Sequence, residues 1–297
     1  GLNLIPRLID EGYNEIIVLD KHKDNILIAK QLFPNITIKE ADVSKSGDWT
    51  KFISSNSTVV MLQAQIGGKI YDDFKKNNIE ATQNIINIIK QKKNIHLVHI
   101  SSSVVTSVAN DFYTNSKKLQ EEIIKNSGIS CAILRPTLMY GWFDRKHLGW
   151  LSRFMRRFPI FPIPGNGKFV RQPLYAGDFC NIIISCIKNK GLSGTYNITG
   201  YEKIFYIDII KMIKKEIASK AIVLKIPFSF FYFLIWLWSL FDNDPPFTTQ
   251  QLVALSADEE FEVIDWPRIF SISYTPLNEA FKETFKNSKY SKVEMKF

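Results

Sequence analysis

A tyrosine and a lysine four residues apart, Tyr113 and Lys117, are the residues of this 297-residue chain best suited to move a proton. One helical turn separates them, so both side chains can project from the same face of a helix. A phenol, with a pKa of about 10, is a weak base at neutral pH, and a nearby ammonium group stabilises its anion. Such a pair can exchange a proton with a substrate hydroxyl or carbonyl.

The same spacing recurs at Tyr71 and Lys75. The neighbouring sequence therefore has to show which of the two pairs is catalytic. The downstream pair follows a predicted strand that ends in three consecutive serines, whereas the upstream pair has no hydroxyl cluster before it. A serine hydroxyl can polarise the oxygen that the tyrosine protonates. We therefore predict catalysis at the downstream pair, with Ser103 as the polarising hydroxyl and Ser102 as its alternative. The other interpretation is the first turn of an ordinary helix.

The elements that must position these residues alternate regularly along the first half of the chain. Short apolar runs follow amphipathic helical patterns, which predicts βαβ units. The predicted fold is α/β, a Rossmann-type doubly wound parallel sheet covered by helices on both faces. In such sheets ligands bind beyond the carboxyl ends of the strands. The expected strands cover residues 15–20, 36–43, 59–65, 95–103 and 130–141, and a long helix is expected over 71–91.

The sequence changes character after Gly141 and becomes aromatic, basic and punctuated by prolines. We predict a nucleotide-binding domain over residues 1–141 and a smaller, mainly helical substrate domain over 142–297. The two are expected to be interleaved, with residues 195–200 returning to the sheet.

A dinucleotide-binding fold places glycines before its first helix and an acidic residue about 20 residues later, which accepts ribose hydroxyls. Gly1 fits the last glycine of such a loop, and Asp20 ends the next strand. We expect the first strand and the other glycines upstream of Gly1; an ordinary helix–strand pair is the alternative. Lys21, His22 and Lys23 could attract a 2′-phosphate, so NAD is favoured and NADP is not excluded.

Two later strand ends offer further cofactor contacts. Asp42 and Val43 follow one strand, where Asp42 could meet the adenine amine or merely cap the next helix. Gln63 and Ala64 end the following strand with small or amide side chains, which suit a close approach of the backbone to a cofactor.

The amino-acid composition indicates what class of protein this is and which partners it can have. With 45% hydrophobic and 23% charged residues the chain is globular. Cys131, Cys180 and Cys186 lie in apolar runs without metal-ligand spacing, so we predict no metal site and buried thiols in a reducing compartment, the cytoplasm. The net charge of +9 favours anionic partners such as nucleotide phosphates. No nucleic-acid-binding module is recognisable, so nucleic acid is not expected as a partner.

An apolar stretch of sixteen residues, 226–241, is shorter than the roughly 20 residues that cross a bilayer. It is either a buried helix or hairpin, or a peripheral contact with the inner face of a membrane, since Trp236 and Trp238 favour the headgroup zone. A second amphipathic segment could lie on an anionic membrane or close over a phosphate-bearing substrate. That segment opposes three arginines to three apolar residues: Arg153, Arg156 and Arg157 against Leu151, Phe154 and Phe158.

Taken together, "IHLVHISSS", "YTNSK" and "LRPTLMYG" resemble, in type and order, the extended short-chain dehydrogenase/reductase family, the NAD-dependent epimerase/dehydratase group. The resemblance runs from Gly1 to about Gly200. It implies an NAD cofactor, a nucleotide-sugar substrate, and hydride transfer in an epimerase, dehydratase or reductase. It also implies that Lys117 clamps the cofactor ribose, that Pro136 lies beside the cofactor, and that the helices at Tyr71 and Tyr113 form a homodimer.

The segment "VRQPLYAGDFC" resembles one in which the family has an arginine seven residues before an aspartate, here Arg171 and Asp178. In nucleotide-sugar members that arginine holds the diphosphate, which a guanidinium can bind in a bidentate manner. Arg171, Ser102 and Ser103 are therefore the predicted substrate-binding residues. A salt bridge is the alternative role for Arg171.

Nine residues separate Ser103 from Tyr113, fewer than in the sugar epimerases of the family. This shortening resembles atypical members near the complex I accessory subunit, in which catalysis is often degenerate. The second hypothesis is therefore a non-catalytic nucleotide-binding module, attached to a membrane or a larger assembly.

Overall fold

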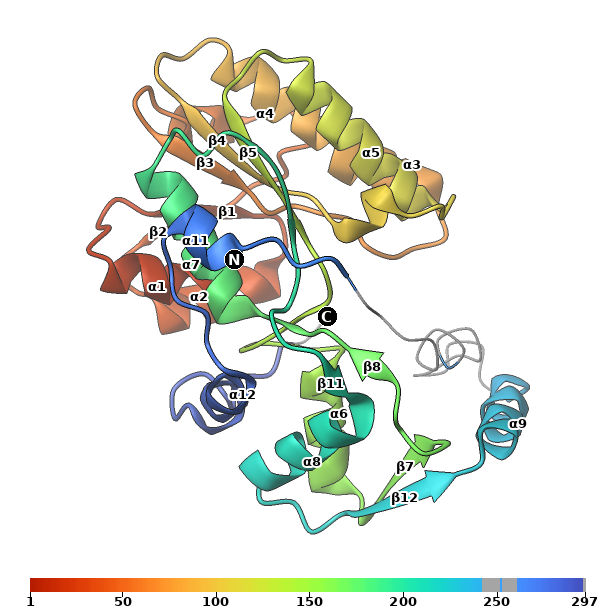
Figure 1. The fold of residues 1–297 in the computed structure, drawn as a ribbon. Coiled ribbons are helices and arrows are strands. Elements are labelled where there is room, and N and C mark those ends of the chain that lie inside the picture. The colour runs from red at the N-terminus through yellow and green to blue at the C-terminus, as the bar shows by residue number, and fades with distance from the viewer. Residues whose placement is uncertain (242–251, 253–260, 296–297) are drawn as a thin grey trace.

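The computed structural model describes residues 1–241, 252 and 261–295, and its first part is built on parallel strands (Figure 1). The strands of this part are β1 (Ile17–Asp20), β2 (Thr37–Glu40), β3 (Thr58–Met61), β4 (His96–Ile100), β5 (Cys131–Pro136) and β10 (Gly194–Ile198). Four of them form one parallel sheet in the order β10-β5-β4-β3, and β1 pairs separately with β2. Strands β4 and β5 are buried almost throughout, as apolar strands covered on both faces must be.

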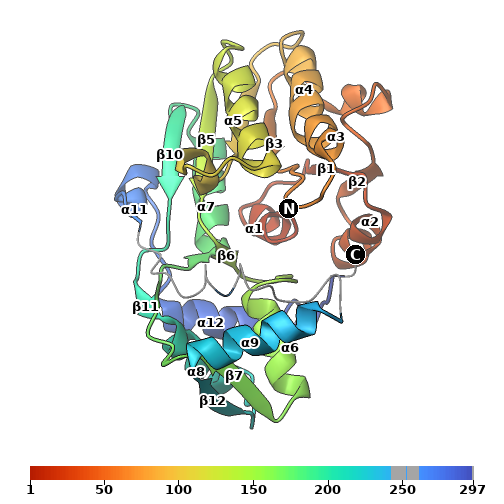
Figure 2. The ribbon, with the colours of Figure 1, turned by 90° about the vertical axis from the view of Figure 1, so that its right-hand side faces the viewer.

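Helices cover both faces of the four-stranded sheet, as the sequence predicts (Figure 2). Apolar side chains of α4 (Ala81–Ile89) and α5 (Phe112–Lys125) meet β3, β4 and β5 in one core. On the other face, α1 (Leu4–Asp10) and α7 (Ala176–Lys188) pack in a second core, and α2 (Lys23–Leu32) packs on β1 and β2. The predicted α/β class with a parallel sheet is confirmed.

The long helix expected over residues 71–91 is interrupted. It consists of α3 (Tyr71–Phe74), a π-helical segment η2 (Lys75–Glu80) and α4. The predicted long helix is present, but its middle turns are π-helical, and they hold Asn78, a fully buried polar residue that hydrogen-bonds across to a neighbouring loop. A π-segment inserts an extra residue per turn, and such bulges often lie at functional sites.

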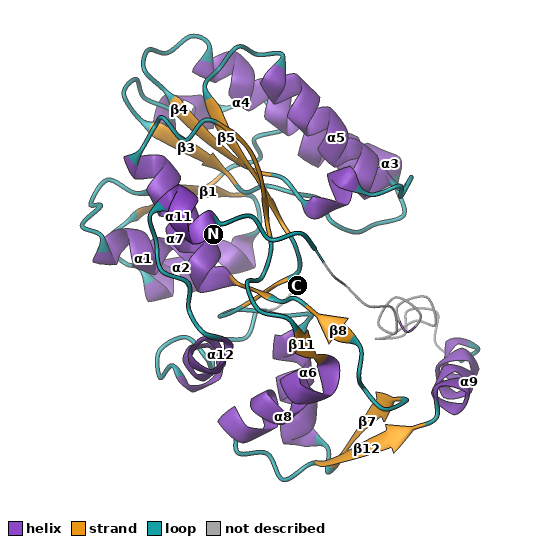
Figure 3. Ribbon diagram, viewed as in Figure 1, coloured by secondary structure: helices purple, strands orange, loops and turns teal. Residues whose placement is uncertain are grey.

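The second part of the molecule has its own core, in which α6 (Leu148–Arg157), α8 (Tyr206–Glu216) and α12 (Leu277–Lys286) pack together. It also contains a parallel two-stranded ribbon of β7 (Ile160–Pro164) and β12 (Ile222–Ile226) (Figure 3). Besides β10, the helices α7 and α11 (Trp266–Phe270) pack with the first part, so the interleaving is wider than the sequence predicts. A short strand pair, β6 (Met139–Tyr140) with β9 (Leu174–Tyr175), joins the two parts, and a second pair, β8 (Val170–Arg171) with β11 (Ile204–Phe205), lies within the second part.

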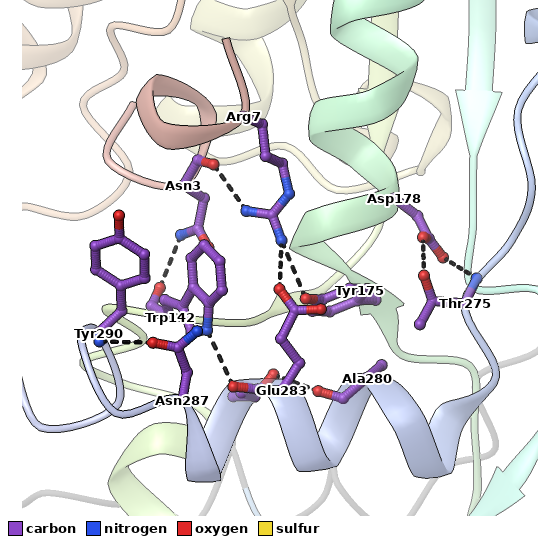
Figure 4. A network of polar contacts seen from close by, with 11 residues as sticks. Asn3, Arg7, Trp142, Tyr175, Asp178, Thr275, Ala280, Glu283, Asn287 and Tyr290 are labelled. Atoms are coloured by element: carbon purple, nitrogen blue, oxygen red, sulfur yellow. Dashed lines mark hydrogen bonds and ion pairs between the residues drawn. The ribbon is translucent and has the colours of Figure 1, made fainter. Parts of the chain in front are cut away.

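Arg7 on α1 ties the two parts together (Figure 4). Its guanidinium forms an ion pair with Glu283 of α12 at 2.9 Å and donates to the Tyr175 hydroxyl at 3.1 Å. It also lies 4.3 Å from the centre of the Trp142 ring. The Trp142 indole in turn donates to the Glu283 carbonyl at 3.1 Å, so one partly buried cation holds three separate segments in place.

The structure can be compared with the expectations for two segments, the basic amphipathic segment and the apolar stretch 226–241. The apolar side of α6 is not presented to a membrane, because Leu151 and Phe154 pack on the second core, and Arg153 donates to carbonyls of the preceding loop. Residues 226–241 form the end of β12 and the helix α9 (Phe228–Ser239), most of whose described side chains are exposed. The side chain of Trp238 lies outside the described part of the structure. Within the described residues, no helix combines the length and the apolarity needed to cross a membrane.

Candidate functional site

The sequence around Asp111 fixes where α5 begins. The Asp111 carboxylate accepts hydrogen bonds from the backbone N–H and the hydroxyl of Thr114, both at 2.9 Å, and so acts as the N-cap. This cap places Tyr113 in the first turn, and Lys117 follows one turn later on the buried side of the helix. The two predicted catalytic side chains therefore lie beside the carboxyl end of β4, which leads into the serine cluster.

Of the two candidate serines, Ser102 is the one whose hydroxyl lies close enough to the Tyr113 phenol to lower its pKa. Ser102 also caps the short 3₁₀-helix η3 (Ser103–Thr106), accepting from the Val104 N–H at 3.4 Å. Ser103 opens that helix, and its carbonyl accepts from the Thr106 hydroxyl at 2.8 Å. The structure thus brings the alternative, Ser102, to the tyrosine, and a role for Ser103 stays a prediction.

The tyrosine is held in its protonated form. Burial raises the pKa of Tyr113, the nearby Ser102 hydroxyl lowers it, and the charge of Asp111 raises it. The two raising effects are stronger, so the pKa of Tyr113 lies above its ordinary value. The Lys117 ammonium, expected to stabilise the phenolate, donates instead to the Ile100 carbonyl at 2.9 Å. At neutral pH this phenol is therefore a proton donor and hydrogen-bond donor rather than a ready base.

Lys117 is fully buried, and burial lowers its pKa to about 8, although the charge of Glu121 one turn further along the helix raises it. Because the pKa of Lys117 in the folded state lies below the ordinary lysine value of 10.5, the unfolded state binds more protons between these two pH values. The free energy of unfolding must then rise with pH across this window.

We expect the free energy of unfolding of the wild type to rise by about 1 kcal/mol relative to Lys117→Met between pH 7 and pH 9. Urea denaturation at both pH values measures the difference, and titrating thiols cancel because both proteins share them. If the difference in free energy of unfolding between the two proteins does not change with pH, the pKa of Lys117 is not lowered by folding.

Glu121 lies below Lys117 on the same face and forms a buried ion network. Its carboxylate accepts from Arg135 at 2.8 and 2.6 Å, from the Ser101 hydroxyl at 2.6 Å and from Lys125 at 3.0 Å. Burial raises the pKa of Glu121, but these hydrogen bonds outweigh it and bring the value to about 2. The network ties α5 to the ends of β4 and β5. It was not predicted because Ser101 and Arg135 lie on other elements, 20 and 14 residues from Glu121.

Asp20 and Gly1, the predicted cofactor residues of the first βα unit, line the same cavity of about 300 Å³. The Asp20 carboxylate accepts from the His22 N–H at 2.8 Å and from the Asn25 amide at 3.2 Å, which fixes its orientation at the end of β1. Trp142 and Arg145 from the second part complete the wall. A carboxylate held at the edge of a cavity of this size suits recognition of hydroxyl groups.

Asp42 does not cap the next helix, because the 3₁₀-helix η1 (Asp48–Phe52) begins six residues later. Its carboxylate instead accepts from the N–H and hydroxyl of Ser44, at 3.1 and 2.6 Å, and lies 3.7 Å from the Lys76 amine. Burial raises the pKa of Asp42, and the Ser44 hydrogen bonds outweigh this and lower it. The Val43 carbonyl accepts from the Asn84 amide at 3.1 Å, which anchors this loop to α4.

The loop after β3 is anchored by Asn78 in the π-segment. The Asn78 amide accepts from the Gln65 N–H at 2.6 Å and donates to the Gln65 carbonyl at 3.0 Å. It also donates to the Ser116 hydroxyl on α5 at 2.8 Å. Ala64 in this loop is exposed, and the buried Gln63 amide nitrogen has no hydrogen-bond partner within the described residues. Asn78 and Asn84 are the residues here that the sequence reasoning left unassigned.

Replacing Asn78 by alanine is expected to lower the free energy of unfolding by about 2 kcal/mol, because the polar groups of Gln65 and Ser116 lose their partner. Urea denaturation provides the measurement. Asn87→Ala on the exposed face of α4 is the matched control and should be neutral or slightly stabilising, since alanine favours helix. Equal effects of the two substitutions would mean that Asn78 does not hold the loop.

The remaining predicted residues lie in or next to strands. Pro136 ends β5 and pairs with Ile198 of β10. Arg171 lies on β8 and is buried, and its guanidinium donates to the Val170 carbonyl at 2.6 Å. Asp178 accepts from the backbone N–H and hydroxyl of Thr275, at 3.0 and 2.6 Å (Figure 4). A diphosphate-binding role of Arg171 stays a prediction.

Metal ligation finds no support in the described part of the chain, where no group of three His, Cys, Asp or Glu side chains could hold an ion. The three cysteines are buried and unpaired. The structure therefore gathers two sets of predicted residues: Ser102, Tyr113 and Lys117 at the end of β4, and Gly1 with Asp20 around the cavity.

Comparisons with known proteins agree with this arrangement. The model of the NAD dependent epimerase/dehydratase family matches residues 1–199. The mitochondrial NADH dehydrogenase (ubiquinone) 1 alpha subcomplex subunit 9 of Dictyostelium discoideum is 24% identical over 212 residues, 70% of this chain and 54% of that protein. This chain thus spans about half the length of that relative.

Two solved structures have a similar fold. UDP-glucuronic acid 4-epimerase from Bacillus cereus, in complex with NAD, gives a TM-score of 0.71 at 18% identity, covering 95% of this chain and 93% of that one. dTDP-glucose 4,6-dehydratase from Bacillus anthracis, in complex with NAD, gives 0.70 at 16% identity, covering 96% and 92%. These similarities confirm the predicted Rossmann-type fold.

Proposed function

Because the chain belongs to the NAD dependent epimerase/dehydratase family, we propose that it binds NAD and acts on a nucleotide-sugar as an epimerase, dehydratase or reductase. The observation that supports this most is the grouping of Ser102, Tyr113 and Lys117 at the carboxyl end of β4, where the Lys117 amine donates to the Ile100 carbonyl. NAD, when bound, supplies the group that accepts and returns a hydride.

The residues around the cavity fit the adenosine end of that cofactor. The Asp20 carboxylate has two fixed donors and keeps further acceptor capacity for ribose hydroxyls. The Lys21 amine donates to Asn77 at 2.5 Å, so it is occupied away from a 2′-phosphate, which favours NAD over NADP. The buried Gln63 amide offers a donor from the loop after β3.

Each residue of the second set has a proposed role at the substrate. Tyr113, protonated at neutral pH, donates a proton to a substrate oxygen and takes it back on the reverse step. Ser102, or Ser103 after a small rotation of the loop, donates a hydrogen bond to the same oxygen. Lys117 clamps the cofactor ribose, and Arg171 binds the diphosphate of the nucleotide-sugar.

Calorimetric titration with NAD tests the cofactor half of the proposal. Asp20→Asn is expected to weaken NAD binding about tenfold, because a charge-assisted hydrogen bond is replaced by a neutral one. Asp24→Asn, an exposed carboxylate on α2, is the matched control and should bind NAD as the wild type does. If the wild type and Asp20→Asn bind equally, Asp20 is not the ribose ligand.

A second candidate function is a non-catalytic nucleotide-binding module within a larger assembly. Two observations favour it: the pKa of Tyr113 is raised rather than lowered, and the Lys117 amine is turned to the Ile100 carbonyl. The likeness to a subunit of mitochondrial NADH dehydrogenase adds support. The two candidates separate in one experiment, because this one predicts NAD binding that no UDP-, GDP- or dTDP-sugar alters.

The proposed compartment is the cytoplasm, which the three buried, unpaired thiols support. We also propose a homodimer through α3 and α5, where Tyr71, Phe112 and Leu119 are exposed apolar residues and the first two rings pack 5.4 Å apart. Light scattering during gel filtration measures the oligomeric state directly.

A further inference from the structure

Helix α9 exposes apolar side chains on most of its circumference. Figure 1 shows it set apart from the helices of both parts of the molecule. Among the described residues of 228–241, Ile235 alone is buried, while Phe230 is 53%, Phe233 48% and Phe241 85% exposed. A water-soluble surface helix normally has a polar face opposite an apolar one. This helix has none, so water is not the environment that its sequence suits.

The apolar surface continues from α9 onto the β7–β12 ribbon. Side chains alternate along both strands: Phe161, Ile163 and Val223 pack on the second core, whereas Ile160, Ile222 and Leu224 point outward and are exposed. Ile160 and Ile222 are register partners, so the outward residues form one continuous row. β12 leads directly into α9 through Pro227.

The size of this surface exceeds what a monomer ordinarily leaves in water. An aromatic side chain can bury about 150–250 Å². Five aromatic residues between Phe230 and Phe241, each roughly half exposed or more, therefore offer on the order of 500 Å². The largest apolar patch on a typical monomer is about 300–600 Å², and here the aliphatic side chains of α9 and the ribbon add to the aromatic area.

Positive charge surrounds the same surface. Arg156 and Arg157 end α6 and are exposed, as is Lys220 before β12. The Ile222 N–H donates to the Pro159 carbonyl at 2.8 Å, which places these cations together at one end of the ribbon. Lys225 is exposed near the other end. Residues 142–226 contain fifteen Arg and Lys against five Asp and Glu, so an anionic partner fits this part of the chain.

We propose that α9 and the outer face of the β7–β12 ribbon insert into one leaflet of an anionic lipid membrane. A protein groove covers one face of a helix, whereas acyl chains can surround it, and α9 is apolar nearly all round. Its twelve residues span about 18 Å, less than the roughly 30 Å hydrocarbon core, so it enters one leaflet without crossing. The flanking arginines and lysines lie where headgroup phosphates attract them. This inference is independent of the proposed enzymatic function.

Flotation of the full chain with vesicles tests the proposal. The protein is expected to float with vesicles of phosphatidylcholine and phosphatidylglycerol (3:1) and about tenfold less with phosphatidylcholine alone. The double variant Phe230→Ser, Phe233→Ser should lose about 100-fold or more in partitioning, because each buried phenylalanine contributes strongly to transfer out of water. Arg156→Glu with Arg157→Glu should lose about tenfold or more on the anionic vesicles and little on the neutral ones.

A matched control substitutes two exposed apolar residues far from this surface, Leu27→Ser and Val108→Ser, and should float as the wild type does. Unchanged thermal unfolding confirms that each variant folds. Absence of flotation with either lipid overturns the proposal. An equal loss of flotation in the control variant also overturns it. The proposal is likewise overturned if the wild type binds no vesicles but associates with itself, and the Phe230→Ser, Phe233→Ser variant is monomeric.

Discussion

Tyr113→Phe is expected to lower turnover of a nucleotide-sugar by about 10²–10⁴-fold, the usual contribution of a positioned acid–base group. The phenylalanine ring fills the same space, so NAD affinity and the free energy of unfolding should change little. The variant removes the phenol hydroxyl beside Ser102 and with it the proton for the substrate oxygen. Turnover of UDP-, GDP- and dTDP-sugars by the wild type and the variant provides the measurement.

Two controls sharpen this result. Tyr71 is the other tyrosine that has a lysine four residues later, and it is exposed on α3. The substitution Tyr71→Phe should therefore leave turnover unchanged. Ser102→Ala and Ser103→Ala separate the two serines, and the position of the Ser102 hydroxyl beside the Tyr113 phenol predicts the larger loss for Ser102→Ala. Equal turnover of Tyr113→Phe and the wild type removes Tyr113 from the mechanism, and absence of turnover in the wild type supports the non-catalytic module.

The features that were predicted correctly are those that depend on local sequence. The alternation of apolar runs and helical patterns predicted the order of β3, β4, α5 and β5, since each element depends mainly on its own periodicity. The four-residue spacing placed Tyr113 and Lys117 on one turn of α5 for the same reason. The order of the strands in the sheet was not predicted, because periodicity alone does not determine it.

The features that were missed depend on contacts between distant segments. The choice between Ser102 and Ser103 depends on how η3 turns after β4, which a run of three serines leaves open. The π-segment holds Asn78, whose hydrogen bonds reach Gln65, thirteen residues away. The parallel pairing of β7 with β12 joins segments about 60 residues apart and gave no local signal beyond two short apolar runs.

The Glu121 network is the clearest case, and it carries the largest expected effect on stability. Glu121→Gln is expected to lower the free energy of unfolding by about 3–5 kcal/mol, because it leaves the half-buried Arg135 guanidinium without its counter-ion. That is a large share of the roughly 5–15 kcal/mol that stabilises a typical domain. Glu122→Gln, on the exposed side of the same turn, is the matched control and should cost little.

The pH dependence distinguishes a lost charge from a packing defect. The pKa of Glu121 is about 2 in the folded state, against an ordinary glutamate value of 4.5. Its contribution to stability is therefore complete above about pH 4.5 and is lost as the pH falls through about 2. The wild type should therefore lose about 3 kcal/mol more than Glu121→Gln across this interval. Urea denaturation between pH 5 and pH 2.5 should show the two proteins converging. A constant gap would mean that the substitution acts through packing alone, since only an ionised carboxylate can lose its stabilising effect on protonation.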